Sequence, residues 1–577
     1  MSEQPTVGLV GDGPALEAVR AALSDRDGES EPLVEAIEPS AAADADLVVV
    51  AAQTGDASFA ETNRRRAGPW LAVALGGIGG LAVAGVEASV AGLGGDGPCY
   101  DCLVTRVRSA LDELPTGSPT VDPAAARLAG AKAGRLALDA LDGRDPVGTV
   151  VELPHAERRL LPVPNCGCDD GSSGALDRTF EPLALEATLE RAEGAVDARL
   201  GPIVSIGEAE SFPAPYYLAG LCDTRGFSDA TASRQAAGVA ADWNPAFVKA
   251  VGEALERYSA GVYRESAFHV APVAALDDVV PPDRFVRPAD AETPAPEEPL
   301  AWVPGEDLRT GDSVHLPAER VVFPPPTERL GPAITTGLGL GSSGVGALVS
   351  GLTEVVERDA TMLAWYSTFA PLGLEVDDAG FDALVRRARS ADLAVSPMLV
   401  TQDVDVAVVT VALHRDGDWP RFAVGSGAAL DPVRAARGAL EEALQNWLEL
   451  RGMGRETAEA EEPRVARYAT FPPEAQTLLD GVEGRVAAAD VGPVDPPTGE
   501  AALAALLDRV AAADLDAYAV RLTPRDVASL GFEAVRVLVP AAQPLFTGER
   551  FFGERARTVP RQLGFRPRLD RPPHPYP

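Results

Sequence analysis

The stretch Gly351-Leu-Thr-Glu-Val-Val-Glu-Arg-Asp-Ala360 places two glutamates three residues apart and an arginine directly after the second. The same Glu-x-x-Glu-Arg pattern recurs at residues 253–257. A third stretch, residues 438–445, spaces Glu442 and Gln445 by three as well. Residues at positions i and i+3 project from one face of a helix. The three stretches therefore predict three helices, each with polar side chains gathered on one face.

The paired glutamates on these faces indicate a metal ion. Two carboxylates on one helical face repel each other unless a cation or a proton compensates. Mg²⁺ prefers oxygen ligands and is commonly held by a few carboxylates together with phosphate oxygens. An ordinary solvated helix face with an ion pair would explain one such motif, but the motif recurs. Residues 337–346 also form a glycine-rich lead-in that offers backbone N–H groups and hydroxyls to phosphate ahead of a helix. The sequence therefore predicts an ATP–Mg²⁺ site.

The order of these motifs resembles that of the YcaO family. The family signatures are an ExxER helix, a Ser-Asn-Gly loop followed by a second ExxER with Asp-Ala, and an ExxQ helix after a glycine-rich stretch that ends in Asp-Pro. The last stretch stands at residues 425–432, and the resemblance covers about residues 180–577. It implies an α+β ATP-binding domain in which Mg²⁺ is coordinated by Glu253, Glu256, Glu354 and Glu357. It also implies a nucleotide pocket formed by Arg257, Arg358, Ser342, Ser343, Glu442 and Gln445.

Two departures from the family pattern concern the phosphate contacts. Ser343 stands where the family has the asparagine of Ser-Asn-Gly, so a hydroxyl replaces a side-chain amide. The Gly-Lys-Gly element that often precedes the first helix reads Ala237-Gly-Val239, so a phosphate-contacting lysine is missing. We expect Arg234 to take the place of that lysine.

The resemblance implies a reaction on a peptide. A Cys, Ser or Thr side chain attacks the preceding backbone carbonyl, ATP phosphorylates the resulting oxygen, and phosphate leaves to give a thiazoline or oxazoline. Thioamide formation and a non-catalytic peptide-binding scaffold are the alternatives. The last residues, Pro573-His-Pro-Tyr-Pro577, favour a stiff polyproline II form, with a disordered end as the alternative. They resemble the tail of azoline-forming YcaO enzymes, which implies that the carboxylate of Pro577 acts as a base.

The first part of the chain predicts a small α/β domain. Residues 6–22 read as a strand, a glycine turn and a helix, and residues 46–52 and 70–75 as buried parallel strands. Two pairs, Cys99-Tyr-Asp-Cys102 and Cys166-Gly-Cys168, supply the four thiolates that structural Zn²⁺ prefers. A reactive dithiol and simple burial are the alternatives. The pairs resemble the zinc-binding part of the ubiquitin-activating-enzyme-like proteins that accompany YcaO cyclodehydratases and bind leader peptides.

We therefore expect a chain of mixed α/β and α+β class with two domains. Residues 1–172 would form a degenerate ubiquitin-activating-enzyme-like zinc domain, residues 173–180 a linker, and residues 181–577 the catalytic domain. The resemblance implies ATP, Mg²⁺ and structural Zn²⁺ as cofactors. It implies a peptide or protein substrate, with a leader-recognition or sulfur-transfer protein and a second copy of the chain as further partners.

The charge of the chain excludes one class of partner. The 577 residues carry a formal net charge of −36, and Lys132 and Lys249 are the only lysines. Such a chain repels the phosphates of nucleic acids, and its acidic surface suits a halophilic, high-salt cytosol in which screening weakens self-repulsion. The N-terminus lacks the pattern of a secretory signal, and the apolar stretch 70–95 is broken by glycines and Glu87. We expect a cytoplasmic protein without a membrane span.

Overall fold

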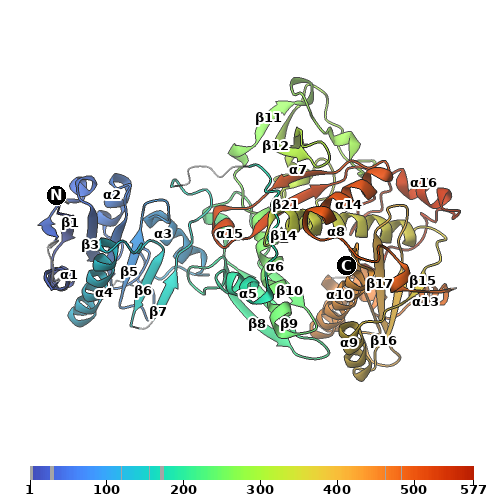
Figure 1. Cartoon of the computed structure of the whole chain (residues 1–577), viewed down its shortest axis with the longest axis horizontal. Helices are drawn as coiled ribbons and strands as arrows, with labels where there is room; N and C mark the ends of the chain where they lie inside the picture. The colour runs from blue at the N-terminus through green and yellow to red at the C-terminus, as the bar shows by residue number, and fades with distance from the viewer. Residues whose placement is uncertain are drawn as a thin grey trace.

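An N-terminal α/β unit lies at one end of the long axis of the molecule (Figure 1). The computed structural model describes residues 4–25, 32–117, 120–154, 156–168, 174–461, 463–482 and 484–576. In the N-terminal unit, seven strands form one sheet in the order β2-β1-β3-β4-β5-β6-β7. The first four pair in parallel and the last three continue the sheet antiparallel. The strands are β1 (Thr6–Gly11), β2 (Leu33–Ala36), β3 (Leu47–Gln53), β4 (Trp70–Leu75), β5 (Ala88–Leu93), β6 (Thr149–Leu153) and β7 (Ala156–Arg159).

Both faces of this sheet are buried, because successive residues along a strand point to opposite sides. In β3, Val48 and Val50 belong to one apolar cluster, and Leu47 and Val49 belong to another. The first cluster includes residues of α2 (Ala57–Arg65) and α3 (Tyr100–Ser109). The second includes residues of α1 (Pro14–Ser24) and α4 (Pro123–Leu141). A mixed sheet with a parallel half, covered by helices on both sides, confirms the predicted α/β arrangement of this unit.

The rest of the chain is organised around three strand–helix units. They are β10 (Gln235–Val239) with α6 (Trp243–Ala260), β14 (Leu338–Gly341) with α8 (Gly344–Trp365), and β18 (Phe422–Ala429) with α10 (Pro432–Met453). The helices are the three that the repeated acidic motifs predict. Their strands belong to three sheets, with the orders β10-β9-β8, β11-β12-β20-β21-β14 with β13 beside β12, and β18-β17-β16-β15-β19. The mixed α/β and α+β class is therefore confirmed.

The remaining elements complete these sheets and cover them. The strands are β8 (Ile203–Glu210), β9 (Tyr216–Leu221), β11 (His269–Pro272), β12 (Pro299–Asp307), β13 (Ser313–Pro317), β15 (Leu372–Glu375), β16 (Ala394–Leu399), β17 (Ala407–His414), β19 (Arg485–Ala487), β20 (Tyr518–Arg521) and β21 (Glu533–Leu538). The helices are α5 (Leu185–Glu193), α7 (Ala318–Val321), α9 (Ala379–Ser390), α11 (Arg455–Glu461), α12 (Pro463–Tyr468), α13 (Pro473–Asp480), α14 (Gly499–Ala512), α15 (Arg525–Ser529) and α16 (Arg555–Gln562). Within the residues described, none of the helices combines the length and the apolar character that crossing a membrane requires.

A glycine in each of the three central strands lets the following helix lie directly against the strand. A Cβ on Gly238 of β10 would lie 2.3 Å from the backbone of α6. A Cβ on Gly339 of β14 would lie 2.3 Å from the backbone of α8, and one on Gly425 of β18 would lie 2.3 Å from the backbone of α10. Only glycine permits so close an approach of two backbones. These contacts set the position of each helix, and with it the position of the polar face.

A buried ion pair joins the N-terminal unit to the rest of the chain. Arg106 of α3 donates to the carboxylate of Asp526 in α15, and both side chains are fully buried. The hydroxyl of Tyr258 in α6 donates to the same carboxylate at 2.6 Å. In Figure 1, α15 lies between α3 of the N-terminal unit and α6 of the rest of the chain. Three elements from distant parts of the sequence therefore converge on one buried carboxylate.

Candidate functional site

A cavity of about 600 Å³ lies where α6, α8 and α10 meet. Strand β10, Thr335 and one face of each helix form its walls. Its charged lining residues are Lys249, Glu253, Glu256, Arg257, Glu354, Glu357, Arg358, Glu441, Glu442 and Glu449. The structure thus brings every glutamate of the repeated motifs, together with Gln445, to one cavity. Its volume is within the range of about 300–1,000 Å³ found for small-molecule sites.

The face of α6 carries a glutamate pair and an arginine. The guanidinium of Arg257 donates to Glu253 from Nε at 2.9 Å and from a terminal nitrogen at 2.6 Å. Burial raises the pKa of Glu256 well above its ordinary value, and the negative charges of Glu253 and Glu354 raise it further. A carboxyl group in this environment holds a proton when no cation is near, and it can exchange that proton for a metal ion.

The face of α8 carries the second glutamate pair. Glu354 accepts the backbone N–H of Gly337 at 3.0 Å, and Glu357 accepts the hydroxyl of Ser426 at 2.6 Å. Burial raises the pKa of Glu354. Burial also raises the pKa of Glu357 to about 7, and the charge of Glu442 contributes to the rise. The hydrogen bonds orient both carboxyl groups while their burial favours a bound cation or proton.

Arg358 links the acidic groups of α8 with those of α10. A terminal nitrogen of its guanidinium donates to Glu442 at 3.3 Å, and other nitrogens lie 3.7 Å from Glu357 and 3.9 Å from Glu354. Burial opposes the charge of Arg358, but Glu442 and the other two carboxylates raise its pKa. On the same helix as Glu442, Gln445 donates to Glu449 at 3.0 Å. A guanidinium in this position can contact both carboxylate and phosphate oxygens.

The donor set of the cavity fits Mg²⁺ bound together with a polyphosphate. Seven glutamates line it against three cationic side chains. Such an excess of negative charge in a partly buried space requires added cations or protons. Hard divalent cations with oxygen ligands satisfy this requirement, and phosphate oxygens complete their coordination. The arrangement can therefore hold metal ions between a row of carboxylates and a phosphorylated ligand.

The structure does not bring Ser342 and Ser343 to this cavity. Ser343 is the N-cap of α8, where its hydroxyl accepts the N–H of Gly346 at 3.2 Å. The carbonyl of Ser342 accepts a bond from Arg191 at 3.4 Å. The start of α8 lies about 15 Å from Glu354, because a helix rises 1.5 Å per residue. Ser343 therefore caps α8, and the phosphate role expected of the two serines stays a prediction.

Residues of the expected linker cover the start of α8. The N–H of Val345 donates to the carbonyl of Thr179 at 3.3 Å. A Cβ on Gly344 would lie 1.9 Å from the carbonyl oxygen of Asp177. This segment occupies the backbone N–H groups that were expected to face a phosphate. Residue 173, where the linker was expected to begin, lies outside the described residues.

Arg234 also lies apart from the lining of the cavity. Its guanidinium pairs with Asp112 at 3.4 Å and with Asp223 at 3.8 Å, and half of its side chain is exposed. The expectation that Arg234 replaces a phosphate-contacting lysine stays a prediction, and in this structure Arg234 forms ion pairs outside the cavity. The lysine in the cavity is Lys249, which pairs with Glu441 of α10.

Several residues of the site escaped the sequence analysis. Lys249 precedes Glu253 by four residues, and Glu449 follows Gln445 by four. The helical repeat therefore places both on the faces that line the cavity. Arg536 of β21 had no such signal. It is buried behind the cavity and donates to the carbonyls of residues 334 and 335 at 2.8 Å and 2.9 Å. Burial lowers the pKa of Arg536 to about 10, although the charge of nearby Glu354 opposes this.

The C-terminal tail packs behind the same carboxylates. Pro577 lies outside the described residues, so the role expected of its carboxylate stays a prediction. Tyr576 is buried, and its hydroxyl lies 3.4 Å from the hydroxyl of Thr410. Thr410 is the strand partner of Ser426, which donates to Glu357. Burial lowers the pKa of His574 to about 3, so its ring is neutral where it contacts the carbonyl of Phe546 at 2.8 Å.

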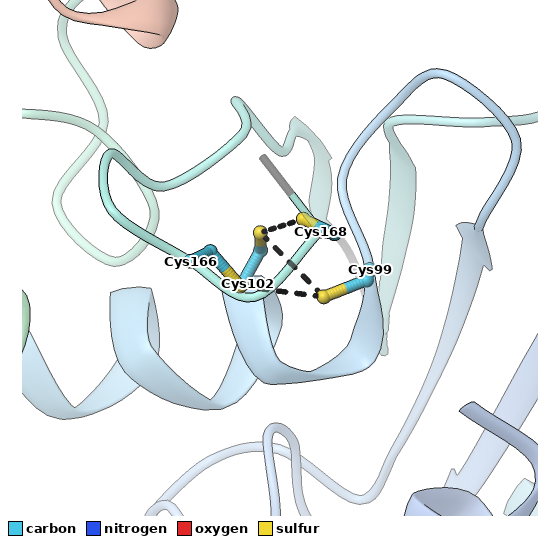
Figure 2. Close-up of side chains that lie close together, drawn as sticks. All are labelled: Cys99, Cys102, Cys166 and Cys168. Carbon is cyan, nitrogen blue, oxygen red and sulfur yellow. Dashed lines mark hydrogen bonds between the residues drawn. The ribbon is translucent and has the colours of Figure 1, made fainter. Parts of the chain in front are cut away.

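The four paired cysteines meet at one point (Figure 2). Cys99 and Cys102 come from the start of α3, and Cys166 and Cys168 from the segment after β7. Their sulfurs lie 3.5–3.8 Å apart in three of the pairs, and all four lie within 4.8 Å of one another. Four thiolates around Zn²⁺ at about 2.3 Å would be separated by about 3.8 Å. The cluster therefore has the dimensions of a tetrahedral Cys₄ zinc site.

The part of the chain that forms the site matches a known protein family. Residues 237–543, more than half of the chain, match the family described as YcaO cyclodehydratase, ATP- and Mg²⁺-binding. The chain belongs to the YcaO family. The match begins at the strand before α6 and ends after β21, so it includes all three carboxylate-bearing helices.

The chain is also similar to a curated relative in sequence and to solved structures in fold. An uncharacterized protein of Methanothermobacter thermautotrophicus is 29% identical over 339 residues, which covers 56% of this chain and 85% of the relative. A heterocyclase solved in complex with substrate and cofactor has a TM-score of 0.70 at 19% identity, covering 99% of this chain and 84% of that one. The heterocyclase TruD has a TM-score of 0.64 at 18% identity, covering 97% and 82%. At these identities the two structures establish a shared fold.

Proposed function

We propose that this YcaO protein uses ATP and Mg²⁺ to activate a backbone amide of a peptide, and that it closes Cys, Ser or Thr residues to thiazolines or oxazolines. The observation that carries the proposal is the convergence of the carboxylates of α6, α8 and α10 with Arg257 and Arg358 on one cavity. The description of the family as ATP- and Mg²⁺-binding cyclodehydratases supports it.

In this proposal the polar residues of the three helices have two roles. Glu253, Glu256, Glu354 and Glu357 hold Mg²⁺, while Arg257, Arg358, Glu442 and Gln445 shape the nucleotide pocket. Bound Mg²⁺ supplies positive charge that stabilises the transferring phosphoryl group. The two arginines lie beside these carboxylates and can orient the phosphate oxygens. The tail residue Tyr576, which precedes the predicted base Pro577 in the sequence, lies beside Thr410, the strand partner of Ser426.

The reaction balances without a redox partner. The substrate side chain loses its hydroxyl or thiol proton and attacks the carbonyl carbon, and the former amide oxygen accepts the γ-phosphoryl group of ATP with release of ADP. Phosphate then leaves with that oxygen, the amide nitrogen loses its proton, and a C=N bond forms in the ring. The peptide loses the elements of one water, and its oxygen appears in the phosphate. The zinc unit, residues 1–172, and the catalytic unit, residues 181–577, are proposed to present and to modify the peptide, respectively.

The purified protein should release phosphate when given ATP, Mg²⁺ and synthetic peptides that contain Cys, Ser or Thr. Each phosphate should match one peptide whose mass is lower by one water, and a heavy-oxygen label in the amide should be found in the phosphate. Glu354→Gln should abolish both products, because it removes a charge from the buried row of carboxylates. The exposed Glu500→Gln variant of α14 is the matched control.

Other outcomes separate the alternatives. Exchange of an amide oxygen for sulfur in the presence of a sulfide donor would select thioamide formation. Mg²⁺-dependent binding of a non-hydrolysable ATP analogue without turnover of any peptide would favour a scaffold. Absence of nucleotide binding would contradict the proposal at its first step.

A further inference from the structure

Lys249 is the one lysine that lines the carboxylate cavity, in a chain whose side-chain cations are nearly all arginines. The sequence has 50 lysines and arginines together, of which only Lys132 and Lys249 are lysines. Lys132 is an exposed residue of α4 in the N-terminal unit. Lys249 lies on α6, one turn before Glu253 and on the same helical face. An ammonium group is a compact charge with freely rotating donors, whereas a guanidinium is a planar fork.

The partner of Lys249 is anchored independently of the lysine. The ammonium group pairs with the carboxylate of Glu441 on α10. Glu441 also accepts the backbone N–H of Ala241 at 3.2 Å. The side chain of Lys249 is 49% exposed and that of Glu441 is 14% exposed. If the lysine moves away, Glu441 therefore keeps a hydrogen bond while the flexible lysine keeps access to water.

Of the three cationic side chains that line the cavity, Lys249 is the most exposed and has the fewest contacts with carboxylates. Arg257 is 23% exposed and binds Glu253 through two nitrogens. Arg358 is 14% exposed and lies within 4 Å of three carboxylates. Lys249 forms an ion pair with Glu441 at an exposed position, and such pairs add little stability. Of the three, Lys249 can exchange a carboxylate for a phosphate with the smallest disturbance of the site.

We propose that Lys249 contacts the nucleotide phosphates, and that its ammonium group leaves Glu441 when ATP binds with Mg²⁺. This inference rests on the proposed function of the cavity as a nucleotide site. Glu441 then acts as a competitor that holds the lysine in the absence of ligand. The pair Lys249–Glu441 would set nucleotide affinity without contributing to the row of Mg²⁺ ligands.

Opposite effects of two variants test this role. Lys249→Met should weaken binding of the β,γ-imido analogue of ATP about tenfold, in line with the loss of one charge-assisted contact, and Lys249→Arg should retain most of the affinity. Glu441→Gln should strengthen binding, because the lysine no longer has a carboxylate competitor. If the pair only holds α6 and α10 together, both variants should weaken binding. Lys132→Met is the control and should leave affinity unchanged.

The presence of two lysines permits a direct measurement on the full-length protein. Acetylation with an amine-reactive ester, followed by peptide mass spectrometry, reports the reactivity of Lys249 with Lys132 as an internal reference. Saturating ATP analogue and Mg²⁺ should slow acetylation of Lys249 about tenfold and leave Lys132 unaffected. Calorimetry on the same samples shows whether the ATP analogue binds, which distinguishes failure of this inference from failure of the proposed function. Binding without protection of Lys249 overturns this inference alone, and absence of binding overturns it together with the proposed function.

Discussion

Among single residues, Glu357 is buried, accepts a hydrogen bond from Ser426, and has Arg358 and Glu442 as charged neighbours. Burial, with a contribution from Glu442, raises its pKa to about 7. In an unfolded chain a glutamate titrates near about 4.3. Between these two values the folded state binds a proton that the unfolded state has lost. The free energy of unfolding of the metal-free protein should therefore fall as the pH rises through this window, and the fall should end above about pH 7.

This pH dependence can be assigned to Glu357 by substitution. In the absence of divalent cations, Glu357→Gln should be more stable than the wild type at pH 8 by about 2 kcal/mol and nearly equal to it at pH 5. Urea unfolding at the two pH values measures the difference. Mg²⁺ should restore the wild type at pH 8 more than the variant. An equal loss of stability in wild type and variant between pH 5 and pH 8 would contradict the assignment, and Glu500→Gln should behave as wild type.

The residues that could be predicted are those whose signal is local. A helical repeat of three or four residues places Glu253 with Glu256, and Glu354 with Glu357, on one face, and the structure brings both faces to the cavity. The glycine-rich stretch that contains Ser343 predicts a phosphate contact, whereas a serine directly before a helix is also a common N-cap. The choice between these roles depends on Asp177 and Thr179, which lie far from Ser343 in sequence. The residues that neighbour Ser343 in the sequence do not indicate that contact.

At the scale of elements, the three helices reach the cavity because each packs directly against a glycine of the preceding strand. Gly425→Ala would place a Cβ 2.3 Å from the backbone nitrogen of Ala443 and 2.8 Å from the carbonyl carbon of Glu442. The helix α10 must then move away from β18, at a cost of about 1–3 kcal/mol in the free energy of unfolding. Because Glu442 and Gln445 move with it, nucleotide affinity should fall in the molecules that remain folded. Chemical denaturation and calorimetry measure the two effects separately.

The same helix contains a matched control. Gly452 of α10 is exposed, and a Cβ there would meet no atom within 4 Å. Gly452→Ala should therefore keep nucleotide affinity and raise stability by up to about 1 kcal/mol, because alanine favours the helix. Wild-type stability and affinity in Gly425→Ala would show that α10 does not depend on this contact. The helices themselves were predictable from their repeats, but a glycine in a strand carries no local sign of the helix that will cover it.

At the scale of the whole molecule, the N-terminal unit and the carboxylate site are joined by contacts between residues remote in sequence. Arg106 and Asp526 are 420 residues apart in the chain. Arg525, the neighbour of Asp526, donates to the sulfur of Cys168 at 3.3 Å, and Tyr258 follows Arg257 on α6. The cysteine cluster and the cavity are thus connected through α15 and α6. Composition and motifs could indicate two units, but no repeat or spacing in the sequence predicts which residues join them.

The buried pair should control the stability of the whole chain. Arg106→Met leaves the carboxylate of Asp526 buried without its cation and should lower the free energy of unfolding by about 3–5 kcal/mol. The double variant Arg106→Met/Asp526→Leu removes both charges and should be less destabilised than the single variant. Arg127→Met is the matched control, since Arg127 makes an exposed pair with Glu17 at 3.9 Å in the same unit and should change stability by less than about 1 kcal/mol. Urea unfolding should also show the N-terminal unit separating from the rest in Arg106→Met, because that unit loses its buried link to α15 and α6. Equal stability of Arg106→Met and Arg127→Met would mean that apolar contacts, rather than the ion pair, hold the two units together.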